Sequence, residues 1–184
     1  MPAMTPADYY AAALELLGER GAEALTVAAV CERVGVTKGS FYHHFDSMAA
    51  LHDGLLAYWE ARQVGPAVDT ALAVASARER LVVLRRMAVA AAHETEVAIR
   101  AWATWYEPAA ETHGRVDDRR RRVLVRTFRE LGIDEAHAVT LARVGTTLMA
   151  GVQSDVGKVD RSVMDEVLTE YQRWIEASIP SAAP

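Results

Sequence analysis

The sequence is poor in cysteine, in internal proline and in positive charge. Its 184 residues include one cysteine, Cys31, so no disulfide can form within the chain. Four of the six prolines lie close to the two ends, which leaves long internal stretches free to form helix. The formal net charge is −5, which excludes a general electrostatic attraction to nucleic acid or to anionic membranes. Any case for DNA binding must therefore rest on local geometry.

Signal peptides, long apolar runs and strand patterns are also missing. The N-terminus, MPAMTPADYY, has neither the basic nor the apolar region of a signal peptide. Arginines interrupt the apolar stretch LVVLRRMAVAAA well before the roughly 18 residues that a membrane span needs. No alternating apolar and polar run is long enough to favour a sheet. We expect a cytoplasmic, all-α globular protein.

Helix-forming residues and caps divide the chain into about nine helices. Thr5 with Pro6 begins the first helix, and Gly21 ends it. A fourth helix begins at Asp46 or Ser47 and ends near Gln63, because Gly65 and Pro66 are expected to break it. The remaining predicted helices cover residues 77–93, 95–106, 108–131, 135–154 and 161–178.

The stretch from Leu25 to Phe45 has the pattern of a helix-turn-helix. Thr26 and Thr37 are suited to cap two short helices, and Gly35 suits a left-handed turn between them. The apolar residues with the spacing to close a small core are Val30, Val34, Val36, Phe41 and Phe45. The residues then left to face outward, with side chains suited to phosphates or base edges, are Thr37, Lys38, Gly39, Ser40, Tyr42, His43 and His44.

This stretch resembles the tetracycline-repressor (TetR) family of bacterial transcription regulators. The residues that carry the resemblance are Gly21, Leu25, Thr26, Gly35, Val36, Lys38, Gly39, Ser40, Tyr42, His44, Phe45 and Leu51. The resemblance implies a three-helix DNA-binding domain at 1–46, a connecting helix at 47–65 and a helical ligand-binding and dimerisation domain at 66–184. It also implies a homodimer joined through the last two long helices, with a recognition helix at about 37–43 in the major groove.

The resemblance places DNA contacts at Thr26, Thr37, Ser40, Tyr42, His43 and His44, and the chemistry of Lys38 and Gly39 adds these two. One position departs from the family pattern, because Met48 stands where a lysine commonly touches the DNA backbone. Residues 1–60 carry three basic and eight acidic side chains, so the DNA-binding part is itself acidic. Both features predict weak nonspecific binding with a shallow salt dependence.

Other readings of the polar clusters are less favourable. His43 and His44 are adjacent, so on a helix they point apart and cannot share one metal ion. Asp117 and Asp118, followed by four arginines, fit an ion-paired solvated helix face better than a second nucleic-acid patch. No catalytic constellation is evident, so we expect no metal, no cofactor and no enzyme activity. The alternative is a helical small-molecule-binding protein or enzyme whose helix-turn-helix is purely structural.

Aromatic residues cluster at 102–106, and two interpretations of them remain open. They are either core of the C-terminal bundle or one wall of an apolar effector pocket. The candidate pocket residues are Met87, His93, Trp102, Trp105, Tyr106, Phe128, Thr146 and Met149. The favoured function is a ligand-responsive, DNA-binding transcriptional regulator, most often a repressor, which we expect in the bacterial cytoplasm in association with the nucleoid. A small, largely apolar effector would release it from a near-palindromic operator.

Overall fold

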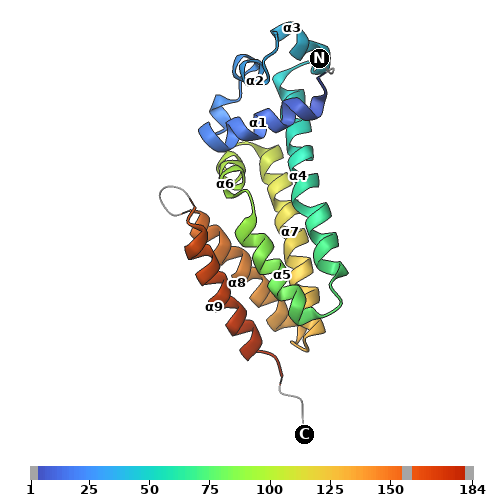
Figure 1. The fold of residues 1–184 in the computed structure, drawn as a ribbon, viewed down its shortest axis with the longest axis vertical. Coiled ribbons are helices and arrows are strands. Elements are labelled where there is room, and N and C mark those ends of the chain that lie inside the picture. Colours follow the sequence, from blue (N-terminus) through green and yellow to red (C-terminus); the bar gives the residue numbers. More distant parts are fainter. Residues whose placement is uncertain (1–3, 155–158, 181–184) are drawn as a thin grey trace. The chain divides into compact units, whose positions relative to one another are not determined.

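The computed structural model describes residues 4–154 and 159–180, and of residues 64–67 only the backbone. Every regular element in these residues is helical (Figure 1). The elements are α1 (Pro6–Arg20), a 3-10 turn η1 (Ala22–Ala24), α2 (Val27–Val34), α3 (Lys38–His44), α4 (Met48–Ala73), α5 (Ala77–Ala90), α6 (His93–Trp102), α7 (Glu107–Glu130), α8 (Glu135–Gln153) and α9 (Arg161–Ala177). The all-α prediction with about nine helices is confirmed for this part of the chain.

Local signals set most helix ends. The Asp8 carboxylate accepts hydrogen bonds from the Thr5 backbone N–H at 2.8 Å and hydroxyl at 2.7 Å, which closes the first turn of α1 and lowers the pKa of Asp8. Gly21 and Gly35 have φ values of 77° and 78°, which residues with a Cβ atom rarely adopt. Asp134 caps α8 by accepting from the His137 N–H at 3.0 Å.

Helix α4 differs from the sequence prediction. It does not end at Gly65–Pro66 but continues to Ala73, so the predicted break is wrong. A proline inside a helix removes one backbone hydrogen bond, at a cost of about 3 kcal/mol. Ala71, beyond the proline, is fully buried, so packing at that end of the helix offsets the local cost.

Helix α6 is also shorter than predicted. It ends at Trp102 rather than near residue 106, and Trp105 and Tyr106 lie in the turn before α7. The hydrogen bond from the Tyr106 N–H to the Trp102 carbonyl, at 3.0 Å, holds this turn closed. None of the described helices is long and apolar enough to cross a membrane.

The chain folds into two compact units, and α4 and α7 each contribute to both. The first contains Met1–Gln63 and Ala92–Arg115, and the second contains Val64–Ala91 and Val116–Pro184. Fully buried side chains of α1, α3, α4 and α6 form the core of the first unit, among them Tyr9, Leu16, Phe41, Leu55 and Ile99.

The second unit has its own core. Buried residues of α5, α7, α8 and α9 form it, and the largest are Phe128, Met164, Tyr171 and Ile175. Helices α8 and α9 lie side by side (Figure 1), and the Tyr171 hydroxyl donates to the Leu141 carbonyl at 2.5 Å. Burial raises the pKa of Tyr171, so this phenol stays a neutral donor.

Candidate nucleic-acid interface

The turn between α2 and α3 is built from backbone hydrogen bonds. The N–H groups of Gly35 and Val36 both donate to the Cys31 carbonyl at 2.9 Å, with Gly35 in the left-handed conformation. The hydroxyl oxygens of Thr26 and Thr37 accept from Ala29 N at 3.2 Å and Ser40 N at 3.3 Å and so cap α2 and α3. The predicted helix-turn-helix is therefore present, with the caps and the turn residue where the sequence placed them.

The inner face of α3 is held against α1 by aromatic packing. Phe41 is fully buried and Phe45 is 5% exposed. The Tyr9 ring on α1 meets both at T-shaped angles, with ring centroids 6.2 Å and 5.4 Å away. The hydroxyls of Tyr9 and Ser40 lie 2.8 Å apart and form a hydrogen bond. These contacts fix the rotation of a helix that is too short to be stable alone.

The outer face of α3 is exposed. Tyr42 is 55% exposed, and Thr37, Lys38, Gly39 and His43 also lie open to solvent. The Tyr42 ring packs edge-on against the Phe41 ring, with ring centroids 5.3 Å apart. This contact orients Tyr42 while the side chain stays exposed. A cation, a phenol and an imidazole on one rigid helix face are suited to phosphate oxygens and base edges.

Two predicted DNA contacts have a partly structural position. Ser40 and His44 are half-buried, and the His44 ring lies 5.3 Å from the Tyr9 ring. The sequence pattern placed His44 among the outward residues, but part of its side chain packs against the core. Residues 41, 44 and 45 share one side of the helix. Because Phe41 and Phe45 are buried, His44 between them is also partly buried.

The electrostatics of this unit match the acidic composition of the sequence. Arg33 on α2 donates to Glu15 at 3.2 Å and to Glu19 at 2.5 Å, and these bonds raise its pKa and lower that of Glu19. Arg33 is thus committed to α1, and Lys38 is the other basic residue of α2 and α3. Met48 is half-buried at the first position of α4 and supplies no charge there.

The aromatic cluster predicted at 102–106 belongs to the first unit. The Trp102 and Tyr106 rings stack at 4.8 Å with an angle of 8°, while Trp105 is 63% exposed. His52 on α4 packs edge-on against Trp102 at 4.9 Å and against Tyr106 at 5.9 Å. Burial lowers the pKa of His52, partly offset by the nearby charge of Asp53.

The sequence argument missed His52. It lies in the apolar first half of α4, and neither spacing nor composition connects it with residues about fifty positions away. Its partners Trp102 and Tyr106 lie within the aromatic cluster noted in the sequence, and their rings stack on each other.

The other pocket candidates are divided between the two units. His93 falls in the first unit and is buried. Phe128 is fully buried in the core of the second unit, and Met149 packs against that core. Met87 and Thr146 also belong to the second unit, where the Thr146 hydroxyl donates to the Arg143 carbonyl at 3.0 Å.

The sequence around the helix-turn-helix matches a known protein family. Residues 10–55, which cover most of α1 through the start of α4, match the family of bacterial regulatory proteins called the tetR family. This matched segment contains the whole helix-turn-helix. None of the curated proteins compared with the chain matches it.

Solved structures of bacterial transcriptional regulators share the fold of this chain. The reduced form of NemR from E. coli matches at a TM-score of 0.78 and 18% identity, covering 98% of this chain and 100% of that one. A TetR transcriptional regulator from Legionella pneumophila matches at 0.76 and 15%, covering 98% and 100%. A transcriptional regulator from Saccharomonospora viridis, solved in complex with choline, matches at 0.79 and 18%, covering 96% and 98%. At these identities the likeness establishes the TetR-regulator fold.

Proposed function

We propose that the chain is a ligand-responsive DNA-binding regulator, and specifically a repressor that leaves a near-palindromic operator when a small effector binds. The observation that carries the proposal is the exposed face of α3. Tyr42, Lys38 and His43 stand on a helix whose other side is anchored by Tyr9, Phe41 and the Ser40 hydroxyl bond. Such an anchored reading helix presents its polar side chains to a groove with little loss of conformational freedom on binding.

The proposed DNA contacts are of two kinds. Thr26 and Thr37 cap their helices through their oxygens, and their hydroxyl hydrogens remain available to phosphates. Lys38, Gly39, Tyr42 and His43 are the exposed residues that can reach base edges or phosphates. Ser40 and His44, which also contact Tyr9, hold the helix in place and reach the DNA backbone at its edge.

The regulator acts as a homodimer, because a near-palindromic operator needs two reading helices. The resemblance to the TetR family implies that the dimer forms through the last two long helices, α8 and α9. Two-fold symmetry would place them about 34–36 Å apart, or slightly more, on one face of B-DNA. The fold-level neighbour in complex with choline supports a small-molecule effector by analogy. For this chain the exposed Trp105 and the half-buried Tyr106, which stacks on the buried Trp102, offer an aromatic surface for a largely apolar molecule.

Selection of bound fragments from genomic DNA, followed by a gel shift, tests the proposal. Tyr42→Ala should weaken binding to the selected site about tenfold or more, the loss expected for one good contact. Tyr42→Phe, which keeps the ring, separates the phenol from the stacking surface. Trp105→Ala is the matched control in the absence of effector, because it removes another exposed aromatic from the same unit without touching α2 or α3.

Two results would refute the regulator. If no fragment is enriched, the helix-turn-helix is structural, and the chain is a small-molecule-binding protein or an enzyme. If Tyr42→Ala lowers the free energy of unfolding by as much as it lowers the free energy of DNA binding, Tyr42 stabilises the fold rather than contacting DNA.

A further inference from the structure

The surface around Trp105 presents aromatic rings to solvent. Trp105 is 63% exposed and Tyr106 is half-buried. The Trp105 ring is tilted by 53° to the rings of both Trp102 and Tyr106, with centroids 6.5 Å and 6.2 Å away. Aromatic surface of this size, left open in the turn before α7, is suited to contact with a ligand.

His52 supports these rings from the side of α4. Trp102 is 1% exposed and stacks on Tyr106, and the His52 ring packs edge-on against both. Burial lowers the pKa of His52, so its imidazole is neutral at about pH 7. The support is therefore rigid and places no positive charge beside the rings.

The two segments that build this surface are acidic. Residues 46–60 contain three acidic side chains and residues 101–114 contain two, and neither segment contains lysine or arginine. Asp53 is exposed and has no ion-pair partner among the described residues. Its charge acts on both neighbours, because it adds to the effect of burial in raising the pKa of Tyr106 and opposes the lowered pKa of His52. Aromatic faces beside such a carboxylate attract cations.

The chain does not supply this cation itself. Within the described residues, the guanidinium that lies over a ring is that of Arg62, 5.3 Å from the centroid of Tyr58 farther along α4. Arg100 and Arg115 flank the aromatic cluster in the sequence, and each is paired with a glutamate, at 3.4 Å and 2.8 Å. The exposed rings and Asp53 are thus open to a cation from solution.

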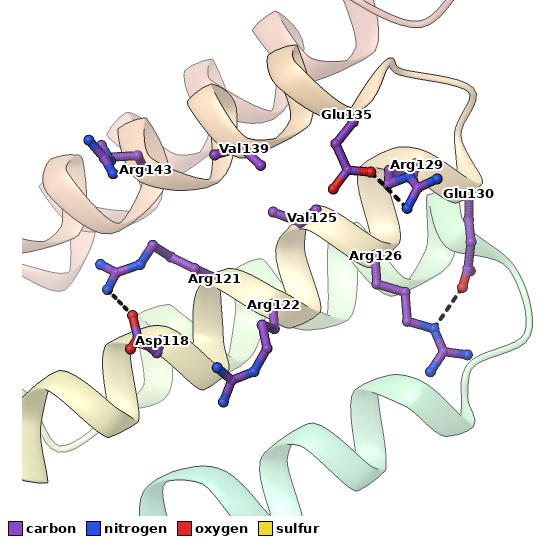
Figure 2. Close-up of a pocket in the computed structure, with 10 residues that line it drawn as sticks. All are labelled: Asp118, Arg121, Arg122, Val125, Arg126, Arg129, Glu130, Glu135, Val139 and Arg143. Atoms are coloured by element: carbon purple, nitrogen blue, oxygen red, sulfur yellow. Dashed lines mark hydrogen bonds and ion pairs between the residues drawn. The ribbon is translucent and has the colours of Figure 1, made fainter.

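The charged groove of the second unit has the opposite preference. It lies between α7 and α8, has a volume of about 950 Å³ and is lined by five arginines and three acids (Figure 2). The three acids are paired with arginines of the same groove, as Asp118 with Arg121, Glu130 with Arg126 and Glu135 with Arg129. Such a lining repels cations, so a cation is expected at the aromatic surface and not in this groove.

We propose that the surface formed by Trp105, Tyr106 and Asp53 binds a small organic cation, and that this cation is the effector. A quaternary or tertiary ammonium ion fits best, because its apolar substituents cover the rings while its charge is attracted by the ring faces and the carboxylate. The inference rests on the proposed function, since it names the chemical class of the effector. It gives the largely apolar molecule a positive charge at the end that meets the rings.

The position of this surface connects it with the reading helix. His52 and Asp53 follow Met48, the first residue of α4, by about one helical turn. Gly54, next in the chain, lies so close to Tyr10 of α1 that a Cβ atom at Gly54 would collide with the Tyr10 ring. Helix α1 in turn holds α3 through the packing of Tyr9 on Phe41 and Phe45. A ligand that shifts this turn of α4 would therefore shift α3 within the same unit.

Titration with tetramethylammonium chloride tests the site on the full chain. An uncharged molecule of similar size, tert-butanol, is the matched ligand, and sodium chloride at equal concentration controls for ionic strength. Each of the two organic probes has a single methyl signal, so ligand-observed nuclear magnetic resonance measures both affinities. The wild type should bind the cation saturably and about fivefold more tightly than tert-butanol.

Two variants separate the ring from the charge. Trp105→Leu keeps an apolar side chain but removes the aromatic face, so it should weaken cation binding about tenfold and leave tert-butanol binding nearly unchanged. Asp53→Asn should weaken cation binding about threefold at low salt and less at high salt. Glu23→Gln is the matched control, because it removes one exposed charge of the same unit away from the rings and should bind the cation as the wild type does. Thermal unfolding of each variant checks that the fold is retained.

A gel shift on the selected operator then tests the effector role. At a saturating concentration, tetramethylammonium should weaken operator binding about fivefold more than sodium chloride does, and Trp105→Leu should abolish this difference. If tert-butanol binds as tightly as the cation, or both variants bind it like the wild type, the cation site is wrong while operator binding by α3 stands. If the cation binds as expected but the operator is bound equally in both salts, the assignment as effector is wrong. If no DNA is selected at all, the regulator fails independently of the cation site.

Discussion

At Gly145, α8 comes into close contact with Tyr171 of α9. A Cβ atom at this position would lie 2.7 Å from Cε1, 2.8 Å from Oη and 2.9 Å from Cζ of Tyr171. These separations are well inside van der Waals contact. Tyr171 is only 6% exposed, and its hydroxyl is bonded to the Leu141 carbonyl, so the ring cannot move aside freely. Gly145→Ala should therefore force the two helices apart or break that hydrogen bond.

The expected size of the effect follows from opposing contributions. Alanine in place of glycine stabilises a helix by about 1 kcal/mol. Overpacking a close contact costs about 1–3 kcal/mol, and loss of a buried hydrogen bond costs about 1 kcal/mol more. The net expectation is a destabilisation of about 2 kcal/mol. For a chain of this length that lowers the melting temperature by about 4–8 °C.

Gly151→Ala provides the matched control on the same helix. Gly151 is exposed, and a Cβ atom there meets nothing within 4 Å. Only the gain in helix propensity remains, so this variant should be as stable as the wild type or more stable by up to about 1 kcal/mol. Both variants are compared with the wild type by thermal and urea unfolding at one protein concentration. If Gly145→Ala behaves like Gly151→Ala, the close approach of α8 and α9 is wrong.

Three further predictions concern other parts of the chain. Met48→Lys should strengthen operator binding and steepen its salt dependence by about two units in a log–log plot for the dimer, because it adds one phosphate contact per subunit; an unchanged slope would place residue 48 away from the DNA. The lowered pKa of His52 means that the unfolded chain takes up a proton below about pH 6.5 before the folded one does. Stability should thus fall from pH 7 to pH 5, and His52→Leu should reduce that fall in urea unfolding, whereas an equal slope would argue against a buried neutral imidazole. Arg80 is 3% exposed and donates to the Val74 carbonyl at 2.9 Å and to Glu130 at 2.6 Å, so Arg80→Met should cost about 2–4 kcal/mol; a loss below 1 kcal/mol would show that these bonds are not needed.

The helix-turn-helix could be predicted from the sequence because its signals are local. A threonine cap bonds to an amide three residues later, and Gly35 bonds back to Cys31 and Glu32, so the instructions lie within a few residues of each other. The buried positions of Val30, Phe41 and Phe45 were found for a related reason, since helical periodicity assigns one side of each helix to the core.

The positions that the sequence argument missed depend on distant residues. Pro66 lies inside α4 although local propensity predicts a break, and His44 is half-buried because Tyr9, on another helix, lies beside it. His52 meets Trp102 only after α4 and α6 have packed together. In each case tertiary burial outweighs or redirects a local preference of about 1–3 kcal/mol, and no short window of sequence contains both partners.

The sequence by itself thus determined the class of fold, the reading helix and its outward residues, because caps, glycines and periodicity act over one or two turns. The tertiary structure alone decided which outward residues are shared with the core and how closely α8 approaches α9. These features arise from packing between helices far apart in the chain, where the free energy depends on the fit of surfaces that form only when the chain has folded.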